Sequence, residues 1–282
     1  MPLAPLSDNV LKPFVGAALA EDLDGKGDIT TDAIIPPNLK WRGAFVARQP
    51  GIIAGLNLAR LAFKTLDPSV SFRPRLKDAS KVKPGDVIAT VDGPARAIIT
   101  GERVALNFMS HLSGVATATH NLVKAMKPYK TRISCTRKTT PGLRLLEKYA
   151  VRAGGGVNHR FGLYDAILIK DNHIAAAGGI RAAVMRARKV HGRKIKIELE
   201  VDSLYQLQEA LSLPIDAVLL DNMKPAILKK AVGLAAGRVI TEASGGITLD
   251  VVKAVAASGV DVISVGWITH SAPILDIGLD EA

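Results

Sequence analysis

The sequence predicts an α/β protein made of a small α+β domain followed by a β/α barrel. Two observations predict this fold class. In the first hundred residues, short strand and helix patterns alternate with the turn motifs Lys83-Pro-Gly-Asp86 and Asp92-Gly-Pro94, which is typical of a mainly antiparallel sheet. Beyond residue 130, six short apolar runs alternate with helical patterns, which is typical of parallel strands joined by helices.

The N-terminal part contains the elements of the small domain. A helix is expected over residues 7–22, with an N-cap at Ser7 or Asp8, although Pro13 shortens it. A polar, glycine-rich loop follows over residues 24–30. The remaining elements are a helix over 55–66 and strands over 41–49, 70–76, 86–91 and 95–99.

A long helix over residues 102–127 connects the two parts, and Pro128 ends it. The strands expected beyond it span 132–136, 166–169, 195–201, 217–220, 238–243 and 262–265. The helices expected between them span 143–153, 175–190, 203–211, 225–236 and 249–257. Six strands leave two arrangements open, because a barrel needs closure by a further strand or by the other domain, whereas a doubly wound sheet stays open.

Charge and composition argue against several classes of protein. The 282 residues carry 37 Lys and Arg against 26 Asp and Glu, a net charge of +11, but aromatic residues make up only 4%. Without a basic tract or stacking aromatics, a nucleic-acid binder is disfavoured. The single cysteine, Cys135, excludes an intrachain disulfide, and no apolar run is long enough to span a membrane. We expect a cytoplasmic protein that binds neither nucleic acid nor membrane.

Charged residues or glycines stand at or near the place where each barrel strand is expected to end. In a β/α barrel these ends and their loops build the active site. One such residue alone is more often a helix cap or a solvated loop residue, but six repetitions favour a site. The residues are Arg137 and Lys138, Lys170 and Asp171, Glu198 and Glu200, Asp221 and Asn222, Glu242 with Ser244-Gly-Gly246, and Gly266.

Individual positions have both a functional and a structural interpretation. Lys170 follows an apolar run, where an ammonium group needs a partner, which favours function. Glu198 and Glu200 share one strand face, which we expect to point into the barrel. His159 follows a glycine-rich stretch and is equally well explained as structural, and Cys135 is expected to be a buried apolar residue.

The balance of charges favours an anionic ligand. If Arg137, Lys138, Arg160 and Lys170 meet two carboxylates, positive charge is in excess and the site repels itself until an anion binds. The two carboxylates, Glu200 and Asp221, suit Mg²⁺ carried in by phosphates. The stretch Ser244-Gly245-Gly246 has the composition of a phosphate-binding loop, although two glycines alone more often mark a turn.

Long motifs then follow one another along nearly the whole chain. They include Glu21-Asp-Leu-Asp-Gly-Lys-Gly-Asp-Ile-Thr30, Gly101-Glu-Arg-Val-Ala-Leu-Asn107, Ser113-Gly-Val-Ala-Thr117, Thr136-Arg-Lys-Thr-Thr-Pro-Gly-Leu-Arg144, Asn158-His-Arg-Phe-Gly-Leu163, Asp165-Ala-Ile-Leu-Ile-Lys-Asp-Asn-His173, Leu219-Leu-Asp-Asn-Met223, Glu242-Ala-Ser-Gly-Gly-Ile247, and Ser264-Val-Gly266 with Thr269-His-Ser271. In these motifs the sequence resembles quinolinate phosphoribosyltransferase, the carboxylating nicotinate-nucleotide pyrophosphorylase family.

The resemblance implies a fold, a reaction and an assembly. The fold is an N-terminal α/β sandwich over residues 1–110, onto which the chain's C-terminus can pack back, and an incomplete β/α barrel of six or seven strands over 111–282. The reaction joins quinolinate to phosphoribosyl pyrophosphate and releases pyrophosphate and carbon dioxide, with Mg²⁺ and without an organic cofactor. The product is nicotinate mononucleotide, in de novo NAD biosynthesis. The assembly is a homodimer with shared active sites, and its further association stays open.

The resemblance also implies roles for residues of this chain. Quinolinate is held by Arg137, His159, Arg160 and Lys170, with Arg103 supplied by the partner subunit. Phosphoribosyl pyrophosphate is held by a set that comprises Lys138, Lys170, Glu200, Asp221, Ser244, Gly245, Gly246, Ser264, Val265 and Gly266. Thr136 is a further substrate-binding residue. The residues expected to act in catalysis are Lys138, Lys170, Glu200 and Asp221, of which Glu200 and Asp221 also bind the metal.

Two alternatives and one departure accompany this interpretation. A nicotinate phosphoribosyltransferase-like enzyme would bind one carboxylate and release no carbon dioxide. A barrel lyase would instead form a Schiff base at Lys170. Trp267 departs from the family pattern, which usually has a small residue beside the phosphate loop, so its side chain either narrows the pocket or lies outside it.

Overall fold

The computed structural model describes residues 3–282, which form two compact units that are interleaved along the chain. The N-terminal unit comprises the chain up to residue 118 with residues 145–155 and 271–282, and the barrel unit comprises residues 119–144 and 156–270. The fold class expected from the sequence is confirmed, with a small sheet domain and a parallel β/α domain. Within residues 3–282, no helix combines the length and apolarity needed to cross a bilayer.

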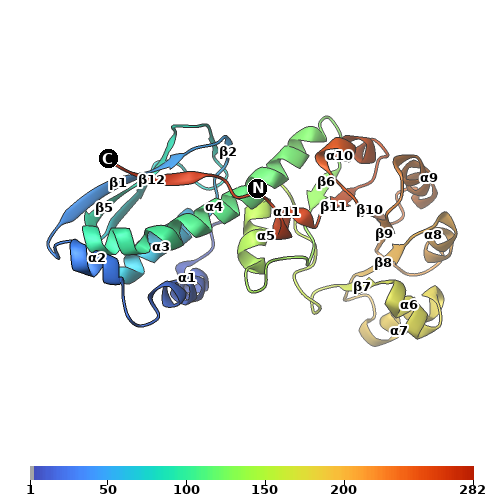
Figure 1. Ribbon diagram of the computed structural model, residues 1–282. Helices are drawn as coiled ribbons and strands as arrows, with labels where there is room; N and C mark the ends of the chain where they lie inside the picture. The colour runs from blue at the N-terminus through green and yellow to red at the C-terminus, as the bar shows by residue number, and fades with distance from the viewer. Residues whose placement is uncertain (1–2) are drawn as a thin grey trace. The chain divides into compact units, whose positions relative to one another are not determined.

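The N-terminal unit is built on an antiparallel sheet with strand order β12-β1-β5-β3, of which Figure 1 labels β1, β5 and β12. Its strands are β1 (Lys40–Ala47), β3 (Ser71–Pro74), β5 (Val87–Pro94) and β12 (Ile277–Glu281), and the short strands β2 (Gly51–Ile52) and β4 (Lys81–Val82) form a separate pair. Its helices are α1 (Asp8–Leu23), α2 (Ile29–Ile34), α3 (Leu56–Leu66), most of α4 (Ala95–Ala125) and of α5 (Arg144–Ala153). Phe45, Phe63 and Phe72 meet in its core with ring centroids 5.8–6.1 Å apart.

Several local expectations for this part were wrong. The strand predicted over 95–99 is the beginning of α4, because a short apolar run fits a buried helix as well as a strand and Pro94 ends the preceding strand. Helix α2 overlaps the predicted loop at residues 29–30, since the Asp28 side chain accepts a hydrogen bond from the Thr31 amide and caps it. Strand β12 was missed, and only its pairing with β1 makes this terminal segment extended.

The barrel unit contains the six predicted strands in one parallel sheet with order β6-β11-β10-β9-β8-β7. They are β6 (Arg132–Ser134), β7 (Ile167–Ile169), β8 (Ile197–Val201), β9 (Ala217–Asp221), β10 (Ile240–Ser244) and β11 (Val262–Ser264). The helices are α6 (Asp171–Ala177), α7 (Ile180–His191), α8 (Leu204–Ala210), α9 (Pro225–Ala235), α10 (Leu249–Ala256) and α11 (Trp267–His270). Gly178 and Gly179, both at positive φ, divide the single helix predicted over 175–190.

The strand order decides between the two arrangements that the sequence left open. The first strand, β6, pairs with the last, β11, so the sheet curls round as a barrel does. It stays open between β6 and β7, and Figure 1 shows the strands in an arc with α8, α9 and α10 along its outer side. Because all six strands are parallel, their carboxyl ends meet at one rim of the arc.

Candidate active site

A cavity of about 810 Å³ opens at the carboxyl ends of the barrel strands. Its lining includes every residue to which the family resemblance gives a role except Arg103, an exposed residue of α4 in the N-terminal unit. Asp171 and Glu198, expected at strand ends, are not part of the lining. The predicted residues that line it are Thr136, Arg137, Lys138, His159, Arg160, Lys170, Glu200, Asp221, Ser244, Gly245, Gly246, Ser264, Val265 and Gly266.

The positive side of the cavity is formed by the segments after β6 and before β7. The Lys138 amide donates to Thr136 Oγ1 at 2.9 Å, which shapes the turn that carries Arg137 and Lys138. Arg160 donates to the carbonyl of Ala166 at 2.9 Å. Burial and the neighbouring charge of Arg137 lower the pKa of the Arg160 guanidinium. The positive charges of the two guanidinium groups repel each other, and an anion bound between them would relieve this repulsion.

The Nε atom of Arg137 supports the same conclusion. It is buried, and none of residues 3–282 accepts a hydrogen bond from it. A buried donor without an acceptor is destabilising, and a bound carboxylate or phosphate oxygen would satisfy it.

The carboxylates of Glu200 and Asp221, on the other side of the cavity, each contact one neighbouring side chain. Lys170 Nζ lies 3.0 Å from Glu200 Oε2. Asn222 Nδ2 donates to Asp221 Oδ2 at 2.7 Å. Each carboxylate has a second oxygen, so both keep acceptor capacity for ribose hydroxyls or a hard cation.

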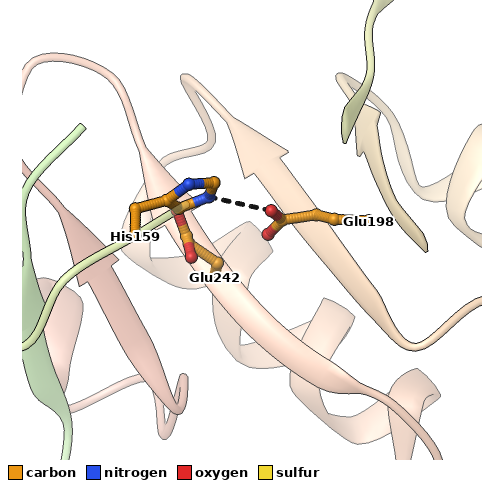
Figure 2. A group of neighbouring side chains, drawn as sticks. All are labelled: His159, Glu198 and Glu242. Carbon is orange, nitrogen blue, oxygen red and sulfur yellow. Dashed lines mark hydrogen bonds and ion pairs between the residues drawn. The ribbon is translucent and has the colours of Figure 1, made fainter. Parts of the chain in front are cut away.

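His159, Glu198 and Glu242 form a histidine–carboxylate cluster (Figure 2), of which His159 and Glu242 line the cavity. His159 Nε2 lies 2.9 Å from Glu198 Oε2 and 3.6 Å from Glu242 Oε1. The other ring nitrogen, Nδ1, accepts a hydrogen bond from the Arg160 amide at 2.8 Å. Both ring nitrogens therefore have partners within the protein, and His159 fixes the backbone that carries Arg160.

Glu242 is the most strongly perturbed carboxyl group of this cluster. Burial raises its pKa to about 7, and repulsion from Glu198 acts in the same direction, while the charge of His159 opposes them. The sequence analysis expected Glu198 and Glu242 at strand ends, but Glu198 lies near the beginning of β8 and Glu242 in the middle of β10. It assigned them no role, because their shared contact with His159 joins β8, β10 and a loop that are distant in sequence.

The loop after β10 has a backbone suited to anions. Gly245 and Gly246 have φ values of +96° and +61°, a conformation that L side chains rarely adopt. A Cβ at Gly245 would overlap Oδ1 of Asn222, so this loop lies directly against the end of β9. Asn222, Glu242 and Trp267, to which the sequence assigned no role, also line the cavity. The sequence did not point to five further lining residues, which are Leu168, Leu219, Ile247, Thr248 and His270.

Cations, carboxylates and a glycine loop around one cavity at the rim of a β/α barrel define an enzyme site for a small anionic substrate. Residues 28–113 match the N-terminal domain of quinolinate phosphoribosyl transferase, and residues 115–280 match its C-terminal domain. The chain belongs to the quinolinate phosphoribosyl transferase family.

Two curated relatives and one solved structure illustrate how far the resemblance extends. A probable carboxylating nicotinate-nucleotide pyrophosphorylase of Bacillus subtilis is 44% identical, over 96% of this chain and 93% of that protein. The carboxylating nicotinate-nucleotide pyrophosphorylase of Mycobacterium leprae is also 44% identical, over 93% and 94%. The solved structure of the nicotinate-nucleotide pyrophosphorylase from Francisella tularensis superposes with a TM-score of 0.94 at 39% identity, covering 100% of this chain and 99% of that one.

Proposed function

We propose that this enzyme transfers the phosphoribosyl group of phosphoribosyl pyrophosphate to quinolinate and releases carbon dioxide, forming nicotinate mononucleotide and pyrophosphate for de novo NAD biosynthesis. The names of its relatives support this reaction. The observation that carries the proposal is the cavity itself, in which Arg137, Lys138, Arg160 and Lys170 face one volume of about 810 Å³. Quinolinate has two adjacent carboxylates, and a site with this excess of cations suits it better than nicotinate, which has one.

The cations nearest the open edge of the sheet are proposed to hold quinolinate. Arg137 and Arg160 bind its carboxylates, with Lys170 beside them, and His159 positions Arg160 through the contact between Nδ1 and the Arg160 amide. The planar guanidinium groups match the geometry of a carboxylate, which fixes the orientation of the pyridine ring.

The other half of the cavity is proposed to hold the phosphoribosyl donor. The loops Ser244–Gly246 and Ser264–Gly266 bind the 5′-phosphate, while Glu200 and Asp221 bind the ribose hydroxyls. Lys138, with Thr136 shaping its turn, contacts the pyrophosphate. We propose that Mg²⁺ enters with the donor, because two carboxylates supply only part of its six-oxygen shell and phosphates supply the rest. The metal would supply charge neutralisation at the pyrophosphate.

The proposed chemistry requires positioning and electrostatics from these residues. The bond between ribose C1 and the pyrophosphate oxygen breaks with its electron pair on oxygen, and Lys138 stabilises the departing charge. The ring nitrogen of quinolinate, held in line by Arg137 and Arg160, forms the new bond to C1. The nitrogen is then cationic, so the bond between the ring and the neighbouring carboxylate can break to release carbon dioxide. The electron pair of that bond stays on the ring carbon until a proton is added. The cationic ring nitrogen of the substrate stabilises the negative charge on the ring carbon, so no organic cofactor is required.

The direct experiment supplies the purified enzyme with phosphoribosyl pyrophosphate and either quinolinate or nicotinate. We expect carbon dioxide and nicotinate mononucleotide from quinolinate only. Turnover of nicotinate without carbon dioxide release would instead establish the single-carboxylate alternative. Borohydride trapping tests the lyase alternative, which the contact between Lys170 Nζ and Glu200 Oε2 disfavours because the amine already has a partner within the protein.

We further propose that the enzyme is a homodimer whose sites are completed by Arg103 of the other subunit. In the barrel unit, β7 is an edge strand, and Leu163 and Tyr164 before it are 73% and 80% exposed. An open sheet edge beside exposed apolar side chains favours coverage by another chain. The lone buried cysteine supports the proposal of a cytoplasmic location for this enzyme.

Complementation between inactive subunits tests the shared site. Arg103→Ala and Lys138→Ala are each expected to lose most activity as homodimers. After mixing and subunit exchange, heterodimers contain one site with both native residues, so about one quarter of the wild-type activity should return. If each site is completed within one chain, the mixture will stay as inactive as its components.

A further inference from the structure

Trp267 joins two loops of the cavity that are distant in sequence. Its indole Nε1 donates a hydrogen bond to the Ile247 carbonyl at 2.9 Å, and both residues line the cavity. Ile247 directly follows the Ser244–Gly246 loop, and Trp267 directly follows the Ser264–Gly266 loop. This hydrogen bond therefore links the segments after β10 and β11.

The opposite side of the same loop is fixed by Asn222. The backbone amide of Asn222 donates a hydrogen bond to the Ser244 carbonyl at 2.8 Å. The Asn222 side chain lies so close to Gly245 that no Cβ would fit at that position. The segment 244–247 is thus held at its beginning from β9 and at its end from Trp267. Between these two attachments lie Gly245 and Gly246, which are the residues with the most conformational freedom in the segment.

The turn that carries Trp267 also contacts the segment after β6. Thr269 Oγ1 donates to the Lys138 carbonyl at 2.7 Å, and a Cβ at Gly266 would lie 3.1 Å from Cδ of Lys138. Residues 266–269 consequently connect the proposed pyrophosphate lysine with the proposed phosphate loop. A displacement of Trp267 would release the end of segment 244–247 while Thr269 still held Lys138.

We propose that Trp267 is a positioning residue that holds segment 244–247 in its anion-binding conformation and so sets the affinity for the donor's phosphate group. The identity of the anion rests on the proposed function, whereas the role of the indole rests on the contacts above. A flexible glycine segment binds an anion more weakly, because its ordering then has to occur on binding. Trp267 removes that cost by fixing the segment beforehand.

Two substitutions separate the hydrogen bond from the ring. Trp267→Phe keeps an aromatic side chain but removes the N–H donor, and we expect the dissociation constant for inorganic phosphate to rise about fivefold. Trp267→Ala removes both and should raise it by about thirtyfold or more. The KM for phosphoribosyl pyrophosphate should rise in parallel, while kcat and the KM for quinolinate stay within about twofold of the wild-type values.

The chain offers a matched control and a spectroscopic probe, because it contains only two tryptophans. Trp41 lies on β1 in the N-terminal unit, and Trp41→Phe should leave phosphate binding unchanged. In that variant Trp267 is the only tryptophan, and its fluorescence should change saturably with inorganic phosphate but not with chloride at equal ionic strength. Calorimetric titration with phosphate gives the dissociation constants of all variants, and circular dichroism shows that they are folded.

The outcomes distinguish this inference from the proposed function. Unchanged phosphate affinity in Trp267→Phe and Trp267→Ala, or no phosphate binding to the wild type in the millimolar range, overturns the role of Trp267 whatever the enzyme's reaction. An equal loss in the KM values for quinolinate and the donor also overturns it, because that pattern indicates general damage to the site. Weakened phosphate binding in an enzyme that does not convert quinolinate supports the role of Trp267 and refutes the proposed reaction.

Discussion

Replacing Glu242 by glutamine should stabilise the barrel unit at pH 8 and have little effect near pH 4.5. Glu242 is buried on β10, and its carboxyl group faces both Glu198 and His159 (Figure 2). Glutamine has nearly the same shape and carries no charge at any pH. The substitution therefore removes the cost of ionising this group and leaves the packing of the strand almost unchanged.

The sign and size of the effect follow from the pKa of Glu242. In the folded protein this pKa is about 7, against an ordinary value of 4.5. Between these pH values the folded state keeps the proton and the unfolded state loses it, so the contribution of Glu242 is fully present below pH 4.5 and is lost as the pH rises through 7. At about 1.4 kcal/mol per pH unit, the wild type loses up to about 3 kcal/mol across this window, and the glutamine variant does not.

Urea unfolding of the wild type and Glu242→Gln at several pH values between 4.5 and 8.5 measures this difference. The free energy of unfolding of the variant should exceed that of the wild type by a margin that grows with pH and levels off above pH 8. Glu21→Gln is the matched control, because Glu21 is exposed on α1 and carries no such burial cost. A margin for Glu242→Gln that is the same at every pH would refute the argument, since a packing effect has no pH dependence.

Three further predictions concern other positions. Gly245→Ala should destabilise the protein by about 1–3 kcal/mol in urea unfolding, because φ is +96° there and a methyl group overlaps Asn222; a wild-type value would mean that the segment relaxes freely. Tyr149→Phe should cost about 1–3 kcal/mol in thermal unfolding, because the Tyr149 hydroxyl donates at 2.6 Å to Asp78, a carboxyl whose pKa is raised by burial; an unchanged melting temperature contradicts this. Cys135 is fully buried, so a thiol reagent should modify it only as fast as the chain opens, and immediate reaction in the native protein would contradict that burial.

Most residues of the candidate site were predictable, because each stands beside a strand pattern that is visible in the local sequence. An apolar run of four or five residues followed by a charge or a glycine marks the carboxyl end of a buried strand, and this marks Lys170 after β7 and Asp221 at the end of β9. Parallel strands bring these ends to one rim whatever the lengths of the helices between them. The residues of the barrel unit to which the family resemblance gives a role therefore line one cavity.

Other features depended on contacts between distant residues. The sequence by itself determined which segments form the six barrel strands, which residues stand near their ends and which family the motifs resemble, since each of these depends on a continuous stretch of chain. Only the tertiary structure decided that β6 pairs with β11, that burial and Glu198 raise the pKa of Glu242, and that the Trp267 indole donates a hydrogen bond to the Ile247 carbonyl. Pairing, burial and hydrogen bonding join residues far apart in the chain, so their energies are defined only once the sheet has curled and brought those residues together.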